Sequence, residues 1–392
     1  MSENDKKHRV LSDLANNHPM LIAIKDGITP QQIKAFTIHC FKPYFFNLNL
    51  DEDDHVVSSL VSESIRMVRI QTDLWSHGIL NSTLNIYRTS AYSDPEQCFK
   101  TFNECWREVE QGVYGFWSIY NLRPKDLIPE SEDYVFDQFR TLGSLLEGSI
   151  QPMLRELLSH SRITKGTDGS MRKIRELDFG VVVGELHDNT EMKSCFSPEP
   201  WGIRINQWRN IAQHQSFRLQ GSKINIRYGK KTKINESWIS VTDLVNVQER
   251  IFQIFNSISF ARVIFSLDNH EHFKQGPDHV TTRLESKLVH LSSLFASQGF
   301  ELLHIDEDDD NVEAVVRDPS GNISIERAAH ASQFLLRIWI YFPVNKIRIQ
   351  YLYSDSITMY FSADGSDCES ASRDDMTLSD FANKVNFQSV QH

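Results

Sequence analysis

The hydrophobic residues of this chain recur mostly at every third or fourth position, which predicts a mainly helical protein. From Phe99 to Tyr120, aromatic and aliphatic residues alternate steps of three and four. A weaker stripe of the same kind runs from Val57 to Val68. Such stripes are packing faces much more often than ligand sites, so we expect both helices to pack into a core.

Four more helices are predicted between residues 131 and 272. Apolar spacing indicates long helices over Phe136–Leu157 and Thr242–Phe265, and a shorter helix from Arg172 to about His187. A fourth helix follows Pro200 and is expected to end near Gly221.

Alternation of apolar and polar residues predicts strands in two parts of the chain. Lys223–Tyr228 and Lys233–Ile239 flank Gly229 and predict a short hairpin. After an expected helix over Thr282–Ala296, four further strands are predicted: Phe300–Ile305, Val312–Val316, Lys346–Tyr353 and Ser356–Phe361. The last two form a second hairpin. Residues 363–375 are rich in Ser and Asp and predict a mobile tail.

These elements predict three regions: an N-terminal helical region (1–130), a helical domain (131–272) and a C-terminal α+β domain (273–392). The expected fold class is therefore mainly α, a helical bundle with a short β-hairpin after one of its helices. A C-terminal α/β (α+β) unit is added to it.

The composition is that of a globular protein with a real core: 392 residues, 40% hydrophobic and 24% charged. The charged N-terminus has no signal-peptide pattern, and no apolar run approaches the roughly 18 residues of a membrane helix. The five cysteines are scattered and predict neither disulfides nor zinc. We therefore expect a cytoplasmic protein that uses no metal or other cofactor and no membrane.

The net charge of −11 argues against a nucleic-acid partner, but its distribution argues for one. Between Pro200 and Asn235 there is no Asp or Glu. A local basic surface on an acidic protein can bind phosphate, because salt confines surface charges to roughly 8–10 Å. The candidate RNA-binding residues of this stretch are Arg204, Arg218, Lys223, Arg227, Lys230, Lys231 and Lys233.

The same stretch contains the motif Arg-Asn-x3-His, at Arg209, Asn210 and His214. Arg-x4-His alone is expected about 0.9 times by chance in this composition, and Arg155 and His160 form a second copy. Requiring Asn after the Arg lowers the expectation to about 0.05 and leaves the copy at 209–214.

Helix geometry predicts that this motif lies on a polar face. At 100° per residue, Asn210 and His214 are neighbours, and Arg209 lies about 140° from His214 at the flank of that face. The opposite, buried face is expected to consist of Trp201, Ile205, Trp208 and Ala212.

These residue types suit RNA cleavage without a metal ion. The 2′-hydroxyl attacks the adjacent phosphorus and the 5′-oxygen leaves, which gives a 2′,3′-cyclic phosphate. A His that titrates near neutrality can move the proton, and an Arg can offset charge on the non-bridging oxygens. The alternative is an ordinary Arg and His on the surface of an amphipathic helix.

A helical hairpin, a helix with R-N-x3-H, a short basic hairpin and a further helix together resemble the HEPN superfamily of ribonucleases and nucleotide-binding domains. The likeness covers residues 131–272, and its specific part is the six residues from Arg209 to His214. Many members have a small residue directly before the His, where this chain has Gln213.

The resemblance implies an endoribonuclease in which Arg209 and His214 are catalytic and Asn210 orients the site. It implies a homodimer with a composite site, RNA as substrate, and a toxin or abortive-infection role in anti-phage defence, with an antitoxin or other defence protein as a partner. Some members are inactive adaptors, so the alternative is a non-catalytic HEPN module that binds a protein or nucleic acid. A small-molecule sensor with the C-terminal unit as its pocket is a third hypothesis.

Two acidic segments offer further candidates. Glu185, His187 and Asp188 could support the motif as a second polar shell, or simply end a helix in solvent. Asp306–Asp310 could hold a cation, but lacks the alternating, Gly-bearing pattern of a calcium loop, so a solvated turn is favoured.

Overall fold

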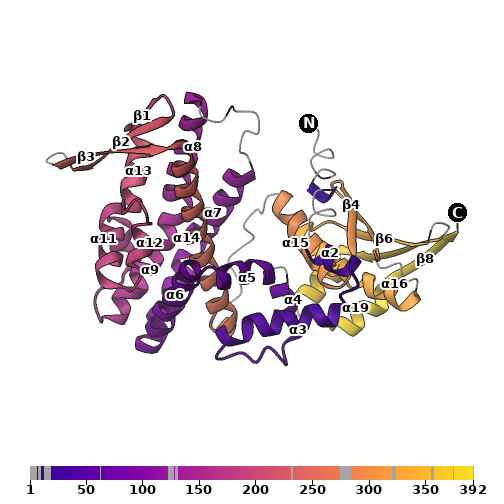
Figure 1. Ribbon diagram of the computed structural model, residues 1–392. Coiled ribbons are helices and arrows are strands. Elements are labelled where there is room, and N and C mark those ends of the chain that lie inside the picture. Colours follow the sequence, from indigo (N-terminus) through magenta and orange to yellow (C-terminus); the bar gives the residue numbers. More distant parts are fainter. Residues whose placement is uncertain are drawn as a thin grey trace. The chain divides into compact units, whose positions relative to one another are not determined.

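The computed structural model describes the chain except for residues 1–6, 8–9, 13–18, 62, 122–127, 129–130, 231–232, 274–283, 320–323, 355–356, 374 and 392. The described part is mostly helical and contains a three-stranded and a five-stranded sheet (Figure 1). It divides into a sheet unit (Met1–Tyr44, Asn49–Val68 and Thr282–His392) and a helical unit (Phe45–Leu48 and Arg69–Thr281). This differs from the three predicted regions, because residues 69–121 belong with the helices that follow them.

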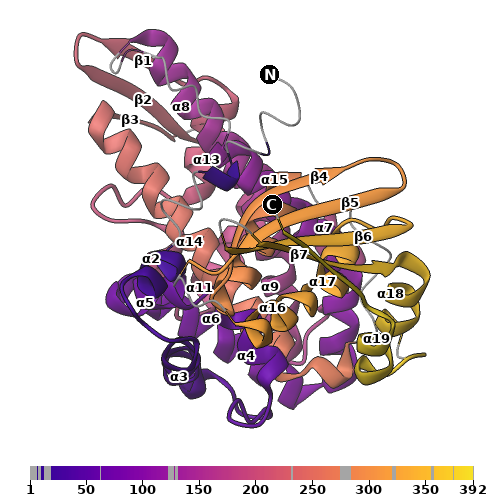
Figure 2. The ribbon, with the colours of Figure 1, turned by 90° about the vertical axis from the view of Figure 1, so that its right-hand side faces the viewer.

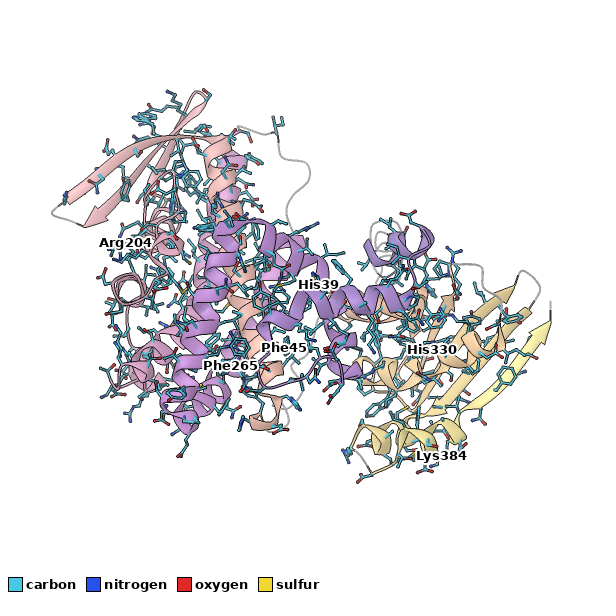
Figure 3. All side chains as sticks on the ribbon, turned by 60° about the horizontal axis from the view of Figure 1, so that its bottom comes forward. His39, Phe45, Arg204, Phe265, His330 and Lys384 are labelled. Carbon is cyan, nitrogen blue, oxygen red and sulfur yellow. The ribbon has the colours of Figure 1, made fainter. Side chains whose placement is uncertain are left out.

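The helical unit is built around four long helices whose apolar stripes face one another. Helix α9 packs against α6, α7 and α11, and α14 packs against α6. The helices predicted over 99–120 and 242–265 are confirmed as α7 and α14, and Phe265 lies among them (Figure 3). The helices of this unit are α6 (Leu74–Ser93), α7 (Pro95–Asn121), α8 (Glu132–Ser144), α9 (Gln151–Thr164), α10 (Met171–Arg175), α11 (Phe179–Asn189), α12 (Lys193–Phe196), α13 (Ile205–Gln213), α14 (Val241–Asp268) and the 3₁₀ turn η3 (His270–His272).

Two of the helices predicted between residues 131 and 272 have internal breaks. The long helix over 136–157 is present as α8 and α9, but they are joined by a π-helix, η2 (Leu145–Ile150). The single helix predicted over 172–187 is wrong. It ends at Arg175 and restarts at Phe179, because Asp178 takes an extended ψ of 144° as the N-cap of α11.

The three-stranded sheet has the order β1-β2-β3 and is antiparallel throughout. Strands β2 (Lys223–Lys230) and β3 (Lys233–Ser240) confirm the predicted hairpin. Strand β1 (Phe217–Gln220) was not predicted, because the preceding helix was expected to continue to Gly221 and instead ends at Gln213. The ring of Phe217 stacks on Phe139 of α8 at 4.0 Å, which fixes the sheet to the bundle.

The sheet unit contains a five-stranded sheet of order β4-β5-β6-β7-β8, whose strands lie side by side in Figure 2. Only β5 and β6 pair in parallel, and α16 and α17 form the crossover that a parallel pair requires. The elements are α2 (Pro19–Lys25), α3 (Pro30–Phe41), η1 (Lys42–Tyr44), α4 (Asp54–Val61), α5 (Ser64–Thr72, which contains the unit boundary), α15 (Leu284–Ser297), β4 (Glu301–Glu307), β5 (Asn311–Arg317), α16 (Ile325–Ser332), α17 (Phe334–Tyr341), β6 (Lys346–Ser354), β7 (Ile357–Asp364), α18 (Gly365–Ser372), α19 (Leu378–Lys384) and β8 (Asn386–Gln391).

The mobile tail predicted over 363–375 is wrong. Ala363 belongs to β7, and α18 follows directly after Asp364. Cys368 and Ala371 of α18 are buried in the core of the sheet unit. The small and polar composition of this segment therefore serves close packing of a short helix, with its Ser and Asp residues on the outer side.

Within the described residues, α14 is the one helix long and apolar enough to cross a bilayer by length and composition. In its most apolar window, 72% of the residues are buried inside the protein. This burial is what a core helix of the bundle shows, since its apolar positions face α6 and its neighbours.

Candidate functional site

Helix α13 carries the motif and is anchored by one apolar side. Ile205, Trp208 and Ile211 are fully buried, which follows from their spacing of three residues. The predicted buried face was partly wrong, because Ala212 is half-buried and Trp201 precedes the helix. The helix packs against α8, η2, α11 and β2, so its polar side is held in a fixed position.

The side chain of Arg209 is paired with a carboxylate that the sequence did not indicate. Its Nη2 lies 2.9 Å from Oε1 of Glu147, and its Nη1 donates to Oδ1 of Asn210 at 3.3 Å. The other carboxylate oxygen of Glu147 accepts from Nε2 of Gln213 at 2.6 Å. Two side chains of α13, those of Arg209 and Gln213, thus bind one acidic residue of the π-helix.

His214 does not lie within the helix but ends it as the C-cap, with φ −93° and ψ 6°. Its backbone N–H still donates to the carbonyl of Asn210 at 3.0 Å, so the expected i,i+4 relation is kept at the main chain. The side chain is exposed, and no hydrogen-bond partner of its imidazole is found among the described residues. The imidazole is therefore accessible to a ligand.

A tight turn after His214 directs the chain into β1. The N–H of Ser216 donates to the carbonyl of Ile211 at 2.9 Å, and that of Gln215 to Ala212 at 3.3 Å, the pattern of a Schellman motif. Gln215 has φ +49°, in the left-handed region that usually takes Gly. The residue directly after the motif is therefore held in a strained conformation.

Glu185, His187 and Asp188, the candidates for supporting the motif, make contacts of their own. Glu185 binds Arg162 of α9 through two hydrogen bonds of 2.6 and 3.0 Å. His187 Nδ1 lies 2.8 Å from Oδ1 of Asp188, and this hydrogen bond, together with the charge of Arg204, lowers the pKa of Asp188. Arg204 Nη2 lies 3.4 Å from Nδ1 of His187. These hydrogen bonds link the three residues to α9 and Arg204, and none of them reaches Arg209 or His214.

The candidate RNA-binding residues lie on α13 and the three-stranded sheet. Arg204 is the N-cap of α13 and is exposed (Figure 3). Arg227 is paired with Glu236 across the hairpin at 3.0 Å. Lys231 and the side chain of Lys230 lie outside the described residues. The remaining members are exposed on the strands: Arg218, Lys223 and Lys233.

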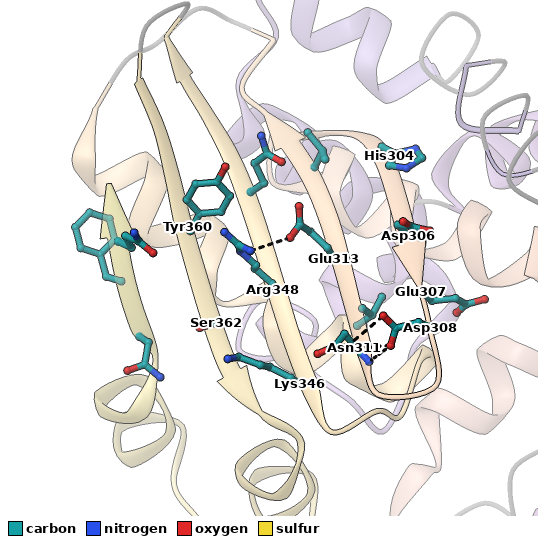
Figure 4. A pocket seen from close by; sticks show the side chains of 16 residues that line it. His304, Asp306, Glu307, Asp308, Asn311, Glu313, Lys346, Arg348, Tyr360 and Ser362 are labelled. Carbon is teal, nitrogen blue, oxygen red and sulfur yellow. Dashed lines mark hydrogen bonds and ion pairs between the residues drawn. The ribbon is translucent and has the colours of Figure 1, made fainter. Parts of the chain in front are cut away.

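The acidic loop between β4 and β5 forms a hydrogen-bonded turn. The carboxylate of Asp308 accepts from the backbone N–H groups of Asp310 and Asn311 at 2.9 and 2.8 Å, which lowers its pKa. No cluster of three possible metal ligands is found among the described residues. The polar face of the five-stranded sheet beside this loop forms a cavity of about 950 Å³, where Arg348 pairs with Glu313 at 3.3 Å (Figure 4).

Comparisons with known proteins give no match: no family model, no curated protein and no solved structure is significantly similar to this chain.

Proposed function

We propose that this chain is a metal-independent endoribonuclease of HEPN type, with its site at Arg209, Asn210 and His214. The observation that carries the proposal is the arrangement at the end of α13. The helix buries one side completely and presents a guanidinium and an accessible imidazole on the other. The guanidinium already holds two oxygens of its surroundings, those of Glu147 and Asn210, in the manner in which it would hold phosphate oxygens.

Each residue has a defined part in the proposed reaction. The 2′-oxygen of one nucleotide bonds to the adjacent phosphorus while the bond from phosphorus to the 5′-oxygen breaks. His214 moves a proton, either from the 2′-hydroxyl or to the leaving 5′-oxygen. Arg209 offsets the charge that builds up on the non-bridging oxygens, and Asn210 orients the guanidinium through its Oδ1. The products are a 2′,3′-cyclic phosphate and a free 5′-hydroxyl.

One His214 cannot act as base and acid in the same step. We therefore include a homodimer in the proposal, with two α13 helices facing each other and one His from each chain in a composite site. The biological role that goes with it is RNA cleavage in anti-phage defence, in the cytoplasm, with an antitoxin or other defence protein as its regulator.

The direct test compares the ends of cleaved RNA. Arg209→Ala and His214→Ala should each lower the cleavage rate by about 100-fold or more, because general acid–base and charge-stabilising groups contribute factors of that size. Arg172→Ala and His270→Ala are matched controls, since both residues are exposed in the same unit. The wild-type products should carry 2′,3′-cyclic phosphates and form equally well in EDTA. A folded Arg209→Ala, His214→Ala double variant that cleaves like wild type would disprove the proposal.

The second candidate is a non-catalytic HEPN module that binds a partner protein or nucleic acid. The ion pair between Arg209 and Glu147 favours it, because the same contact would fasten α13 to η2 in a purely structural role. In that case the wild-type chain binds its partner without producing cyclic phosphate ends, and Arg209→Ala lowers stability and not a cleavage rate.

A further inference from the structure

The three-stranded sheet has two faces of different chemistry. On the inner face Ile224, Ile226 and Ile239 are buried, and β2 packs against α13. Near the hairpin end, the backbone N–H of Gly229 donates to the side chain of Gln207 of α13 at 2.9 Å. The inner face therefore fixes the sheet directly beside the motif helix.

The outer face carries an exposed tryptophan between polar residues. The strand register places Arg218, Asn225 and Trp238 in one row across β1, β2 and β3. Trp238 is 52% exposed, and no other Trp with a described side chain is exposed. Neighbouring strands are about 4.8 Å apart, so the backbone of Arg218 on β1 lies about 10 Å from that of Trp238 on β3.

The charge on this outer face favours an anionic ligand. Lys223 lies on the same face as Asn225, two residues earlier in β2, and both Lys223 and Arg218 are exposed. The one acidic residue of the face, Glu236, is neutralised by Arg227 at 3.0 Å. Two exposed cations thus lie on the β1 and β2 side of a flat aromatic ring at the β3 edge.

We propose that this outer face binds single-stranded RNA, with one base stacked on the indole of Trp238 and neighbouring phosphates at Arg218 and Lys223. The proposal rests on the proposed function in that RNA is taken as the ligand. A base that stacks on a side chain must be free of its own duplex, so the substrate class is single-stranded or looped RNA. The inner face of the same sheet packs on α13, so a strand bound on the outer face is held in the same unit as the motif.

A protein partner is the competing occupant of this surface. Strand β3 is an edge strand, and Ile234, four residues before Trp238 on the same face, is 55% exposed. A second copy of the chain could pair along such an edge. The charge of the face favours RNA, because pairing along the β3 edge would leave Arg218 on β1 and Lys223 on β2 without an anion to bind.

The experiment measures binding by the full chain carrying His214→Ala, so that no probe is cut. The probes are a fluorescent 12-nucleotide oligoadenylate, a ribose-phosphate chain of the same length without bases, and a duplex. Trp238→Ala should weaken oligoadenylate binding by about tenfold, while Trp238→Phe keeps it within about threefold, because stacking needs an aromatic ring. Ile234→Ala is the matched control for an exposed apolar residue on the same face and should bind like the parent.

The base-free probe separates stacking from charge. Trp238→Ala should leave the binding of the base-free probe and of the duplex unchanged. Arg218→Gln combined with Lys223→Gln should weaken the binding of all three probes and lower the slope of log affinity against log salt concentration by roughly 0.7 per lost contact. Oligoadenylate binding by Trp238→Ala equal to the parent would overturn the inference. So would a Trp238→Ala variant that loses only self-association in sedimentation, which would assign the face to a protein interface.

The outcome is distinguishable from a failure of the proposed function. A wild-type chain that makes no cyclic phosphate ends but binds oligoadenylate through Trp238 would disprove the nuclease and support this inference. A nuclease that depends on Arg209 and His214 but binds RNA equally well without Trp238 would support the proposed function and disprove this inference.

Discussion

Two histidines in this chain, His160 and His214, follow an arginine by five positions, and they differ in burial. His160 is fully buried in α9, where its Nδ1 lies 3.0 Å from Oγ of Ser90. Near it, Arg262 and Glu156 form a buried ion pair at 3.0 Å, also within the core of the bundle. His214 is exposed at the end of α13. The extra Asn in the motif therefore selected the copy with an exposed His, and the other copy is part of the core.

The buried His160 predicts a loss of stability in acid. Burial, with a smaller contribution from the charge of Arg262, lowers the pKa of His160 from 6.5 to about 3. Between these values the unfolded chain binds a proton that the folded chain does not, so the free energy of unfolding falls as the pH drops below 6.5. At pH 4.5 the loss due to His160 should be roughly 2.7 kcal/mol.

Urea unfolding at pH 7 and pH 4.5 checks this. His160→Gln, which can still bond to Ser90, should lower the pH dependence by that amount, and His270→Gln at an exposed position should not change it. Equal pH dependence in wild type and His160→Gln would contradict the assignment.

At the motif itself, the residue that matters most beyond the three predicted ones is Glu147. Its carboxylate occupies the guanidinium of Arg209 and repels phosphate, so Glu147→Gln should raise the affinity for a non-cleavable 2′-deoxy oligonucleotide by about two- to fivefold. The gain should shrink at high salt. Glu132→Gln, at an exposed position of α8, is the control. Weaker binding by Glu147→Gln would mean that the carboxylate orients Arg209 for RNA and does not compete with it.

At the scale of elements, the sequence predicted the helices and strands whose own residue pattern is sufficient to determine them. Helices α7 and α14 and the hairpin β2–β3 were predicted because their apolar periodicity is long and regular. The π-helix η2 was not predicted, because one extra residue in a helical turn does not change the amino-acid composition of the segment. Strand β1 was missed because Gln215, and not a Gly, takes the left-handed position that ends α13.

This conformation of Gln215 predicts a stability gain on substitution. Gln215→Gly should raise the free energy of unfolding by about 0.5–1 kcal/mol, because Gly adopts the left-handed region without steric cost. The opposite substitution at Gly221 is the control. Its φ is +61° and a Cβ there would meet no neighbouring atom, so Gly221→Ala should lower the free energy of unfolding by about 1 kcal/mol through the backbone alone. Denaturant unfolding of both variants checks the pair. A Gln215→Gly variant no more stable than wild type would show that the side chain of Gln215 stabilises the turn.

At the scale of the whole molecule, the sequence could not show which segments fold together. The helical unit takes in residues 45–48, far from the rest of it in sequence, because the carboxylate of Asp268 accepts hydrogen bonds from the backbone N–H groups of Phe46, Asn47 and Leu48. The site shows the same limit. Arg209, Asn210 and His214 were found by their local spacing, whereas Glu147 lies 62 residues from Arg209 and is brought to it only by the packing of α13 on η2.

The composite site of the proposed dimer gives the last prediction, and mixing of two variants tests it. If each reaction needs His214 from both chains, a heterodimer of wild type and His214→Ala should be inactive, so activity should fall with the square of the wild-type fraction. RNA should strengthen the pairing, because two facing Arg209 side chains repel each other unless phosphate lies between them. The chains are exchanged at a constant total concentration with an increasing fraction of His214→Ala, and the total cleavage rate is measured, with His270→Ala as the mixing control. A linear fall of activity, or equal cleavage by a verified monomer, would show that one chain carries the complete site and that a second proton-transferring group must be sought near His214 itself.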